Sequence, residues 1–351
     1  MKQIGIITYH NADNLGAVLQ AYALQTILQN NCCVHAEIID YRCDAIEATK
    51  FVAYEKWLKV NVKAIAKSAY YCIKRRGFDK FRKKYLKRSE EVYTPQSVRM
   101  KLPDYDAYIT GSDQVWNPEC SGWDDTYFLN FVPEGRKKYA YAASLGTFRF
   151  PAECSDHYRM LLKDFSLISV RETSAIAEME QLGIQDVMVC PDPVVLLEKE
   201  QWQKIMPKRL CRQRYVLVYL VLPDREVSKQ AEHYAKENNC KVIHNKKSLE
   251  FILHNSPAEF LSWVYYAECV FTNSFHGTAF SLIFDKPLAA DVLMTDGDIN
   301  NRVQEILLAA GAEHCAMTEE NSIPRAANTG STLTRMRSDG LAYLKELCEA
   351  I

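Results

Sequence analysis

The chain has 351 residues, 48% of them hydrophobic, and a formal net charge of −1. This length is more than one ordinary core accommodates, so we expect two domains, and the balanced charge gives no reason to expect nucleic-acid binding. The twelve cysteines include no CxxC pair, the apolar start IGIITY is too short for a signal peptide, and no apolar run approaches the ~18 residues of a membrane span. We therefore expect a cytoplasmic protein with free thiols, no metal site and no cofactor.

The first half of the chain alternates β-like and helix-like runs. QIGIITY is typical of a buried parallel strand, the polar loop HNADNLG follows, AVLQAYALQTILQN has the apolar stripe of a helix, and VHAEIIDY is a second strand. This order predicts a βαβ unit. Further strands are expected at 104–111, 138–144 and 166–172, and a helix at 174–183 ends at a glycine. Together these elements predict a Rossmann-like domain over residues 1–200.

A second series of the same kind follows a polar, basic hinge at residues 199–214. RYVLVYLVL and CKVIHN are expected strands on either side of the helix SKQAEHYAKENN, and SPAEFLSWVYYAECV is a helix that runs into a strand, with Ser256-Pro257 as its start signal. KPLAADVL adds a strand and NNRVQEILLAAG a helix. We expect a second Rossmann-like domain over 210–330, a final helix over 331–351, and a central cleft that the two domains face.

A basic helical insertion is expected at about residues 45–90. Residues 50–88 hold fourteen Lys/Arg and only two acids, a local charge of +12 that leaves −13 for the rest of the chain. On a helix, an apolar face carries Leu58, Val62, Ile65, Ala69 and Cys72, the opposite face carries Lys56, Lys59, Lys63, Lys67 and Lys74, and Phe78, Phe81 and Tyr85 follow at spacings of three and four. The segment is either a packed helix with a solvated basic face or a docking face for an anionic membrane or polyanionic substrate. Nucleic acid is disfavoured because no recognition motif accompanies the charge.

Two strand ends in the first predicted domain carry candidate binding residues. In NADNLG, Asn11, Asn14 and Gly16 lie where a strand opens onto a helix, a position that binds ligands in α/β sheets and favours anions. The alternative for Asn14 is an ordinary helix cap. In ITGSDQVWNP, Asp113 is placed to orient a hydroxyl or to cap a helix, and Trp116 to stack on a sugar ring or to cover the core.

Two further strand ends carry charged residues. Arg171 ends an apolar strand in SVRETSA, where a charge needs a partner. Glu172 is one candidate, and a ligand carboxylate or phosphate is the other, since arginine binds both through paired hydrogen bonds. Asp192 lies between two prolines in CPDPVV, so a rigid loop either aims its carboxylate into the cleft or forms a structural turn.

The stretch FTNSFHGTAFSLIFDKP carries the strongest catalytic signal. Ser274, His276, Gly277 and Thr278 lie between an expected strand and an expected helix. The helix N-terminus and the Thr278 hydroxyl would hold an anion, and an anion beside His276 would favour its protonated, acid form. Only His10, directly after the first strand, has a comparable setting among the other histidines.

Taken together, these stretches resemble the polysaccharide pyruvyl transferase family. The carriers are GIITYHNADNLGAVLQAYALQ, DAYITGSDQVWN, ISVRETSA, CPDPVVLL, TNSFHGTAFSLIFDKP and NNRVQEIL, which occur in the family's order over about residues 4–306. The resemblance implies a GT-B-like fold and the transfer of a pyruvyl group from phosphoenolpyruvate to two hydroxyls of one sugar, with release of phosphate. The chain departs from the family's pattern at Ser274, where many members carry an arginine. Arg302, His10 or a lysine would therefore have to supply the missing positive charge.

The resemblance also implies roles for the candidate residues. Catalytic residues are His276 as the acid, Arg171 as a donor ligand and Asp113 as the group that activates the acceptor hydroxyl. Donor-binding residues are Asn14, Gly16, Ser274, Gly277, Thr278 and Arg302, and acceptor-binding residues are His10, Asn11, Trp116 and Asp192.

The implied product is a pyruvate ketal on a hexose, at O4 and O6 of a galactose-type residue, in capsular or exopolysaccharide synthesis. A polyprenyl-diphosphate-linked acceptor would give the +12 segment a purpose, holding a cytoplasmic enzyme at the inner face of the membrane. The alternatives are a GT-B glycosyltransferase that uses a nucleotide sugar and a non-catalytic glycan-binding protein.

Overall fold

The computed structural model describes residues 1–50, 62–293, 300–318 and 323–351. The chain divides into two compact units. Unit 1 comprises residues 1–62, 80–196 and 337–351, and unit 2 comprises residues 63–79 and 197–336. Part of the expected basic insertion, residues 51–61, lies outside the described residues.

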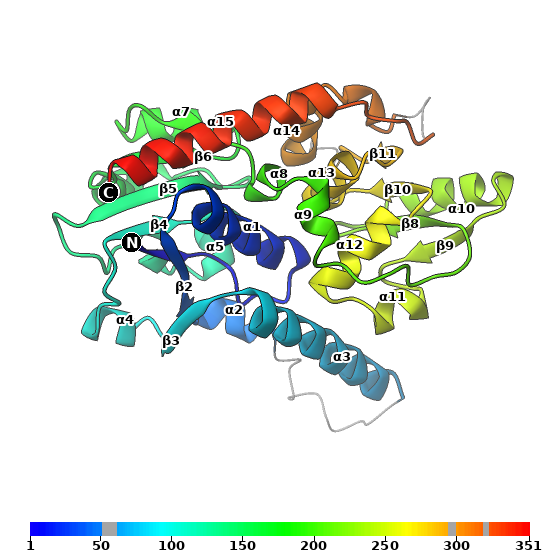
Figure 1. Ribbon diagram of the computed structural model, residues 1–351, viewed down its shortest axis with the longest axis horizontal. Coiled ribbons are helices and arrows are strands. Elements are labelled where there is room, and N and C mark those ends of the chain that lie inside the picture. The colour runs from blue at the N-terminus through cyan, green and yellow to red at the C-terminus, as the bar shows by residue number, and fades with distance from the viewer. Residues whose placement is uncertain (51–61, 294–299, 319–322) are drawn as a thin grey trace. The chain divides into compact units, whose positions relative to one another are not determined.

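Unit 1 is built on a seven-stranded parallel sheet in the order β3-β2-β1-β4-β5-β6-β7 (Figure 1). Its strands are β1 (Gln3–Ile7), β2 (His35–Tyr41), β3 (Arg88–Tyr93), β4 (Ala107–Thr110), β5 (Lys137–Ala143), β6 (Leu167–Val170) and β7 (Met188–Val189). Its helices are α1 (Leu15–Asn31), α2 (Asp44–Ala48), α4 (Ser97–Met100), α5 (Pro118–Ser121), η2 (Asp125–Phe128), η3 (Ala152–Cys154), α6 (Ser155–Leu162), α7 (Ser174–Gln181) and α8 (Pro193–Leu196). The expected βαβ start is β1-α1-β2, and β1 pairs with both β2 and β4.

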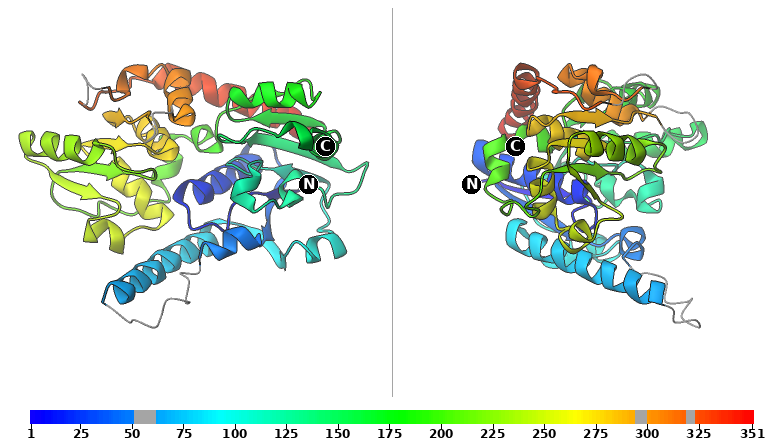
Figure 2. Two further views of the ribbon diagram at one scale, coloured as in Figure 1. Left: turned by 180° about the vertical axis from the view of Figure 1, so that it is seen from behind. Right: turned by 90° about the vertical axis from the view of Figure 1, so that its right-hand side faces the viewer.

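Helices cover both faces of this sheet, as the views from the front in Figure 1 and from behind in Figure 2 show. The central strands are therefore buried on both faces, which explains their nearly continuous apolar runs. Close packing requires glycine at position 5 of β1, because a Cβ there would collide with the ring of Tyr105. Helix α7 is closed by Gly183, whose φ of 73° is the left-handed conformation that glycine adopts at helix ends.

Unit 2 is built on a four-stranded parallel sheet in the order β11-β10-β8-β9. Its strands are β8 (Tyr215–Tyr219), β9 (Lys241–His244), β10 (Cys269–Thr272) and β11 (Leu288–Ala290). Its helices are α9 (Lys199–Gln203), α10 (Val227–Glu237), α11 (Leu249–Leu253), α12 (Pro257–Tyr265), α13 (Phe275–Ile283), α14 (Asn301–Ala310) and η4 (Glu313–Cys315). The start signal predicted at Ser256-Pro257 is confirmed, because the Ser256 side chain caps α12 and Pro257 is its first residue.

The two faces of the unit 2 sheet have separate cores. On one face, Val216, Val218 and Phe271 pack with Val227 and Ala231 of α10. On the other face, α13 approaches β8 and β10 so closely that a Cβ on Gly277 would meet the side chains of Thr272 and Tyr219. Helices α10 and α13 therefore lie on opposite faces of this sheet, as right-handed βαβ connections in opposite directions from its centre require.

Helices α3 (Val62–Tyr85) and α15 (Gly330–Glu349) each contribute residues to both units. For the residues whose burial is described, the predicted apolar face of the basic helix is wrong, because Ala69 and Cys72 are exposed. The buried side chains are instead Phe78, Phe81 and Arg82, with 0%, 2% and 2% exposure. Larger apolar surface gains more on burial, so the two aromatic rings decide which face packs.

The prediction of an α/β protein with two Rossmann-like units, as in a GT-B-like fold, is confirmed by two parallel sheets that are each followed along the chain by their own crossover helices. All twelve cysteines are free thiols. Within the described part of the chain, none of the helices has both the length and the apolar character that crossing a membrane requires.

Candidate active site

In unit 1 the loops that carry the predicted residues leave neighbouring strands. β1 lies beside β2 on one side and β4 on the other, so the strand order reverses between β1 and β4, where open α/β sheets bind ligands. The loops after these two strands contain HNADNLG and GSDQVWN. They are joined by hydrogen bonds from Thr8 Oγ1 to the Ser112 carbonyl (2.9 Å) and from the Tyr9 hydroxyl to the Gln114 carbonyl (3.0 Å).

The loop after β1 is also held from outside the sheet. The Arg82 guanidinium of α3 donates to the Ala12 carbonyl (3.2 Å) and to Asp13 (2.6 Å). The Asn11 amide donates to Glu47 of α2. Arg82, one of the cations of the basic segment, therefore holds this loop in place. Asn11 is 4% exposed and also anchors the loop.

The remaining predicted residues of this loop have structural partners. Asn14 is exposed and caps α1 by accepting a hydrogen bond from Ala17 N–H (3.2 Å). An ordinary helix cap was the alternative to ligand binding predicted for this residue. Gly16 is buried within α1. His10 has no exposed surface and contacts Asp40 through Nε2 (3.0 Å).

The His10–Asp40 pair has opposite electrostatic consequences for its two members. Burial lowers the pKa of His10 despite the hydrogen bond to Asp40. Burial alone would raise the pKa of Asp40, but the His10 hydrogen bond and the nearby Arg42 and Arg88 lower it to about 2. This network places His10 in the protein interior, so the expectation that it binds an acceptor or replaces the missing arginine is not supported.

Asp113 is part-exposed, unlike the buried Gly111 and Ser112 that precede it. Its φ of 75° is unusual for a residue with a Cβ, and strain of this kind costs about 1–3 kcal/mol and often marks functional sites. Its backbone pairs with Ala143 of β5, and its Oδ1 accepts from Gln114 N–H (2.9 Å). The carboxylate therefore sits at the carboxyl edge of the sheet in a fixed orientation.

Trp116 belongs to the core of unit 1. It has no exposed surface and stacks on Phe128, with 5.6 Å between ring centroids and 3° between ring planes. The structure favours the core-covering alternative, because no face of the indole is open to a sugar.

Arg171 and Asp192 pair with each other. Arg171 donates to Asp192 Oδ2 through Nη1 (3.0 Å) and to Ser144 Oγ through Nη2 (2.9 Å). Asp192 Oδ2 also accepts from Ser112 Oγ (3.0 Å), and its Oδ1 accepts from Val194 N–H (3.1 Å). The expected ligand partner of Arg171 is thus a carboxylate of the protein, which the sequence did not pair with it.

Glu172 completes this network. Its Oε1 accepts from Ser144 Oγ (2.9 Å) and from the backbone N–H groups of Leu145 (2.6 Å) and Gly146 (2.9 Å). Burial lowers the pKa of Arg171, but Glu172, Asp192 and Asp113 raise it above its ordinary value. One guanidinium is thus surrounded by three carboxylates, and this edge disfavours an anionic ligand and suits a hydroxyl.

In unit 2 the strand order reverses between β8 and β10. Asn273 fixes the two loops at this point. Its Oδ1 accepts from the N–H groups of Val221 (2.9 Å) and Leu222 (3.2 Å), and its carbonyl accepts from Asn300 Nδ2 (3.0 Å). The N-terminus of α14, which carries the part-exposed Arg302, is therefore tied to the loop that starts α13.

The start of α13 is an uncharged helix cap. Ser274 is its N-cap and accepts from Gly277 N–H through Oγ (3.3 Å). Gly277 is required by its close approach to Thr272 and Tyr219, rather than by a ligand. Thr278 has no exposed surface, and its N–H donates to the Ser274 carbonyl (2.9 Å). The side chain at position 274 therefore supplies a cap and no charge.

His276 is part-exposed at the second residue of α13, and its ring contacts Phe275 edge to face with 5.0 Å between centroids. The helix N-terminus beside it favours a negative charge.

Burial divides the thirteen predicted site residues into two groups. Four reach solvent, namely Asn14, Asp113, His276 and Arg302. Nine are buried, namely His10, Asn11, Gly16, Trp116, Arg171, Asp192, Ser274, Gly277 and Thr278.

A family model described as polysaccharide pyruvyl transferase matches residues 14–290, well over half of the chain. The chain belongs to the polysaccharide pyruvyl transferase family. It is therefore a transferase, and the matched region contains Asp113, Arg171 and His276. No curated protein matches the sequence.

Solved structures match over nearly the whole chain at low similarity. UDP-N-acetylglucosamine 2-epimerase from Rickettsia bellii has 10% identity and a TM-score of 0.43, with 100% of this chain and 96% of that chain covered. The Neisseria meningitidis epimerase bound to UDP-GlcNAc has 9% identity and a TM-score of 0.44, with 99% and 94% covered. The E. coli heptosyltransferase WaaC with ADP has 12% identity and a TM-score of 0.38, with 96% and 99% covered.

Across the described residues, no three His, Cys, Asp or Glu side chains gather in a way that could hold a metal ion. Glu172, one of the two partners predicted for Arg171, does lie beside it, with 3.6 Å between Glu172 Oε2 and Arg171 Nε. The structural roles of Ser144, Asn273 and Arg82 were not predicted, because these residues contact segments that only folding brings near them.

Proposed function

We propose that this family member transfers the pyruvyl group of phosphoenolpyruvate to two hydroxyls of one hexose, forming a cyclic pyruvate ketal. The observation that carries the proposal is His276, part-exposed at the start of α13 within the region that matches the family. Protonation of the enol carbon of phosphoenolpyruvate needs an acid, and histidine is the side chain most suited to that role near neutral pH.

The reaction balances with the two hydroxyls as its proton source. His276 gives a proton to the CH₂ carbon, which becomes CH₃ and leaves a cationic centre. One sugar hydroxyl attacks this centre and loses its proton, phosphate leaves with the C–O bond electrons, and the second hydroxyl closes the ring. Of the two hydroxyl protons, one replaces the proton given by His276 and the other leaves on hydrogen phosphate.

The charges of the two sheet edges support a division of roles. In unit 2, the N-terminus of α13 and Arg302 suit the phosphate and carboxylate of the donor, and Arg302 stands in for the arginine that the family carries at position 274. In unit 1, Asp113 is the part-exposed carboxylate of an acidic edge and acts as the base for an acceptor hydroxyl. Arg171 holds Asp192 and Ser144 and serves as a positioning residue.

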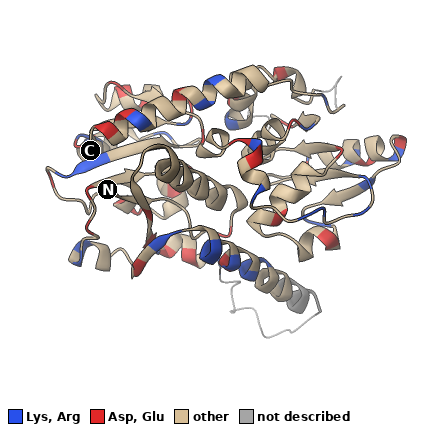
Figure 3. Ribbon diagram, viewed as in Figure 1, with Lys and Arg blue, Asp and Glu red and all other residues tan. Residues whose placement is uncertain are grey.

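The acceptor we propose is a galactose-type residue, modified at O4 and O6, on a polyprenyl-diphosphate-linked precursor of a capsular or extracellular polysaccharide. The basic helix α3 supports this choice. Arg75, Arg76, Lys80, Lys83 and Lys84 are all exposed along it (Figure 3). Cations gathered on one helix favour an anionic lipid surface or a diphosphate.

The test is acceptor-dependent release of phosphate from phosphoenolpyruvate, with simple β-galactosides and lipid-linked oligosaccharides as acceptors. We expect His276→Ala to lower the rate by at least about a hundredfold. His233→Ala, which removes an exposed histidine of α10, is the matched control and should leave the rate unchanged. Arg302→Ala should raise KM for phosphoenolpyruvate more than it lowers kcat. Wild-type protein that neither binds nor consumes phosphoenolpyruvate would overturn the proposal, and release of nucleoside diphosphate from a nucleotide sugar would support a glycosyltransferase instead.

A further inference from the structure

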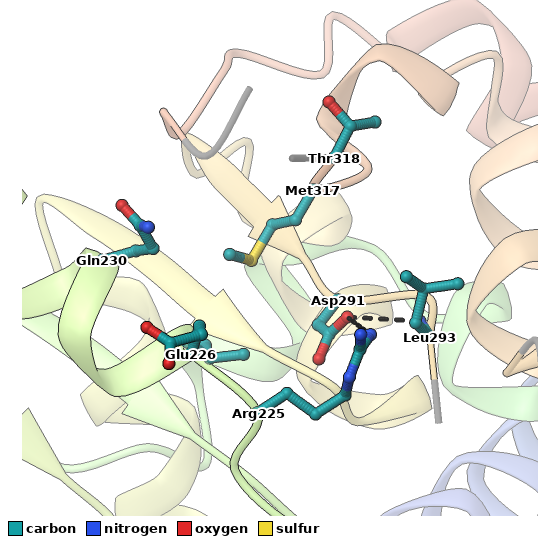
Figure 4. A pocket seen from close by; sticks show the side chains of 8 residues that line it. Arg225, Glu226, Gln230, Asp291, Leu293, Met317 and Thr318 are labelled. Atoms are coloured by element: carbon teal, nitrogen blue, oxygen red, sulfur yellow. Dashed lines mark hydrogen bonds and ion pairs between the residues drawn. The ribbon is translucent and has the colours of Figure 1, made fainter. Parts of the chain in front are cut away.

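Unit 2 contains a pocket that the roles above do not use. Its volume is about 350 Å³, within the range of ~300–1,000 Å³ typical of small-molecule sites. It is lined by Arg225, Glu226, Val227, Gln230, Asp291, Leu293, Met317 and Thr318 (Figure 4). These residues come from the loop after β8, the first turns of α10, the end of β11 and the segment after η4.

Asp291 is the polar residue at the bottom of this pocket. It is 5% exposed, its N–H donates to the Thr272 carbonyl (2.8 Å), and its Oδ1 accepts from Leu293 N–H (3.2 Å). Its Oδ2 is buried and finds no hydrogen-bond donor among the described residues. Burial raises the pKa of Asp291. A buried carboxylate oxygen without a donor is costly, and a ligand that donates a hydrogen bond would remove that cost.

The pocket is separate from the start of α13. It lies on the α10 face of the sheet, because its wall residues Val227 and Met317 pack against the core on that face. His276 belongs to α13, on the opposite face. The two positions therefore offer separate binding environments at the same edge of one sheet.

The lining selects for a neutral polyol. A phosphate would be repelled by Asp291, whose carboxylate forms the base, and by Glu226 at the rim. An amine would be repelled by Arg225, whose Nη1 lies 3.8 Å from Asp291 Oδ1. A hydroxyl donates to Asp291 and also accepts from Arg225. The side chains of Val227, Leu293 and Met317 offer an apolar wall of the kind that packs against the C–H face of a pyranose ring.

We propose that this pocket binds a pyranose through a hydroxyl that donates to Asp291 Oδ2, with Arg225 at its rim. The pyranose is one sugar unit of the polysaccharide acceptor, a reading that rests on the proposed function, whereas the binding itself does not. The pocket thus holds the acceptor chain by a sugar unit in addition to the one that is modified.

The experiment is saturation-transfer-difference NMR of the full chain, titrated with methyl β-galactopyranoside and methyl β-glucopyranoside. We expect saturation transfer to at least one glycoside and an affinity about tenfold lower for Asp291→Asn, which replaces the acceptor oxygen by a donor. Glu232→Gln removes the same charge from an exposed position on α10 and is the matched control. Leu293→Trp should abolish binding by filling the pocket, and thermal unfolding checks that each variant is folded.

Two results would overturn the inference: no saturation transfer to either glycoside, or equal affinities for Asp291→Asn and Glu232→Gln. Tighter binding of inorganic phosphate or ethylammonium than of both glycosides would also overturn it. His276→Ala should leave glycoside binding unchanged while it lowers the rate of phosphate release by at least about a hundredfold. If the protein binds a glycoside but neither binds nor consumes phosphoenolpyruvate, the pocket inference stands and the proposed function is rejected. If the protein releases phosphate but Asp291→Asn leaves glycoside affinity unchanged, the proposed function stands and the pocket inference is rejected.

Discussion

The carboxyl edges of the two sheets use polar residues differently. At the edge of unit 1, Arg171 is buried and forms ion pairs with Asp192 and Glu172, which are also buried. Asp113 alone of the charged residues predicted there reaches solvent. At the edge of unit 2, the loops are fixed by the uncharged side chains of Asn273 and Ser274. A polar residue after a strand therefore either holds the loops of the edge together or remains accessible to a ligand, and burial distinguishes the two.

The largest expected effect comes from breaking the buried pair in unit 1. Asp192→Ala removes the buried carboxylate to which the Arg171 guanidinium donates a hydrogen bond, and we expect it to lower the free energy of unfolding by about 3–5 kcal/mol. Urea denaturation measures this change. Asp156→Ala, which breaks the surface pair of Asp156 with Arg159, is the control and should cost less than about 1 kcal/mol. Equal effects would mean that the unit 1 edge does not depend on its charge network.

Asp113 should show the opposite pattern, with lost activity and retained stability. Asp113→Asn keeps the shape of the side chain and removes the base, so kcat for acceptor-dependent phosphate release should fall by about a hundredfold. The melting temperature should change little, because Asp113 is part-exposed. Asp104→Asn alters an exposed carboxylate of the same unit and should change neither quantity. A stability loss as large as that of Asp192→Ala would place Asp113 among the structural residues.

The Asp40 network predicts how stability changes with pH. Its lowered pKa of about 2 means that its contribution is complete above the ordinary aspartate value of about 4 and is lost as pH falls through 2. The lowered pKa of His10 acts at higher pH, because the unfolded chain binds a proton below about 6.5 that the folded protein excludes, so stability also declines below that pH. Urea midpoints from pH 8 to pH 2 measure both. Asp40→Asn should reduce the loss of stability below pH 4, and an unchanged profile would contradict the assignment.

The smallest effect is expected at the uncharged cap of unit 2. Ser274→Ala removes the acceptor for Gly277 N–H and should cost about 1 kcal/mol in the free energy of unfolding. Ser274→Asp keeps an acceptor and should retain stability, but its negative charge should raise KM for phosphoenolpyruvate. If Ser274→Asp left KM unchanged, the anion site would lie away from α13.

The sequence predicted the elements well because their signals are local. Apolar runs, Ser256-Pro257 and Gly183 mark strands, a helix start and a helix end within a few residues. The prediction of the buried face of the basic helix was wrong, because periodicity alone does not compare the apolar surface of Phe78 and Phe81 with that of Ala69 and Cys72. The loops of the candidate site were also predicted, but the pairing of Arg171 with Asp192 was not, since 21 residues separate them and only the order of β5, β6 and β7 brings them together.

The last turns of α15 have a consequence for how the protein is made. Residues 337–351 belong to unit 1, where the Tyr343 hydroxyl donates to the Ala140 carbonyl of β5 (2.9 Å) and Leu344 and Leu347 have no exposed surface. On the ribosome, the strands of unit 1 emerge early, but the helix that covers β5 is translated after the whole of unit 2. The first domain to be synthesised is thus the last to complete its core, and a nascent or prematurely terminated chain presents an uncovered apolar sheet face to chaperones and proteases.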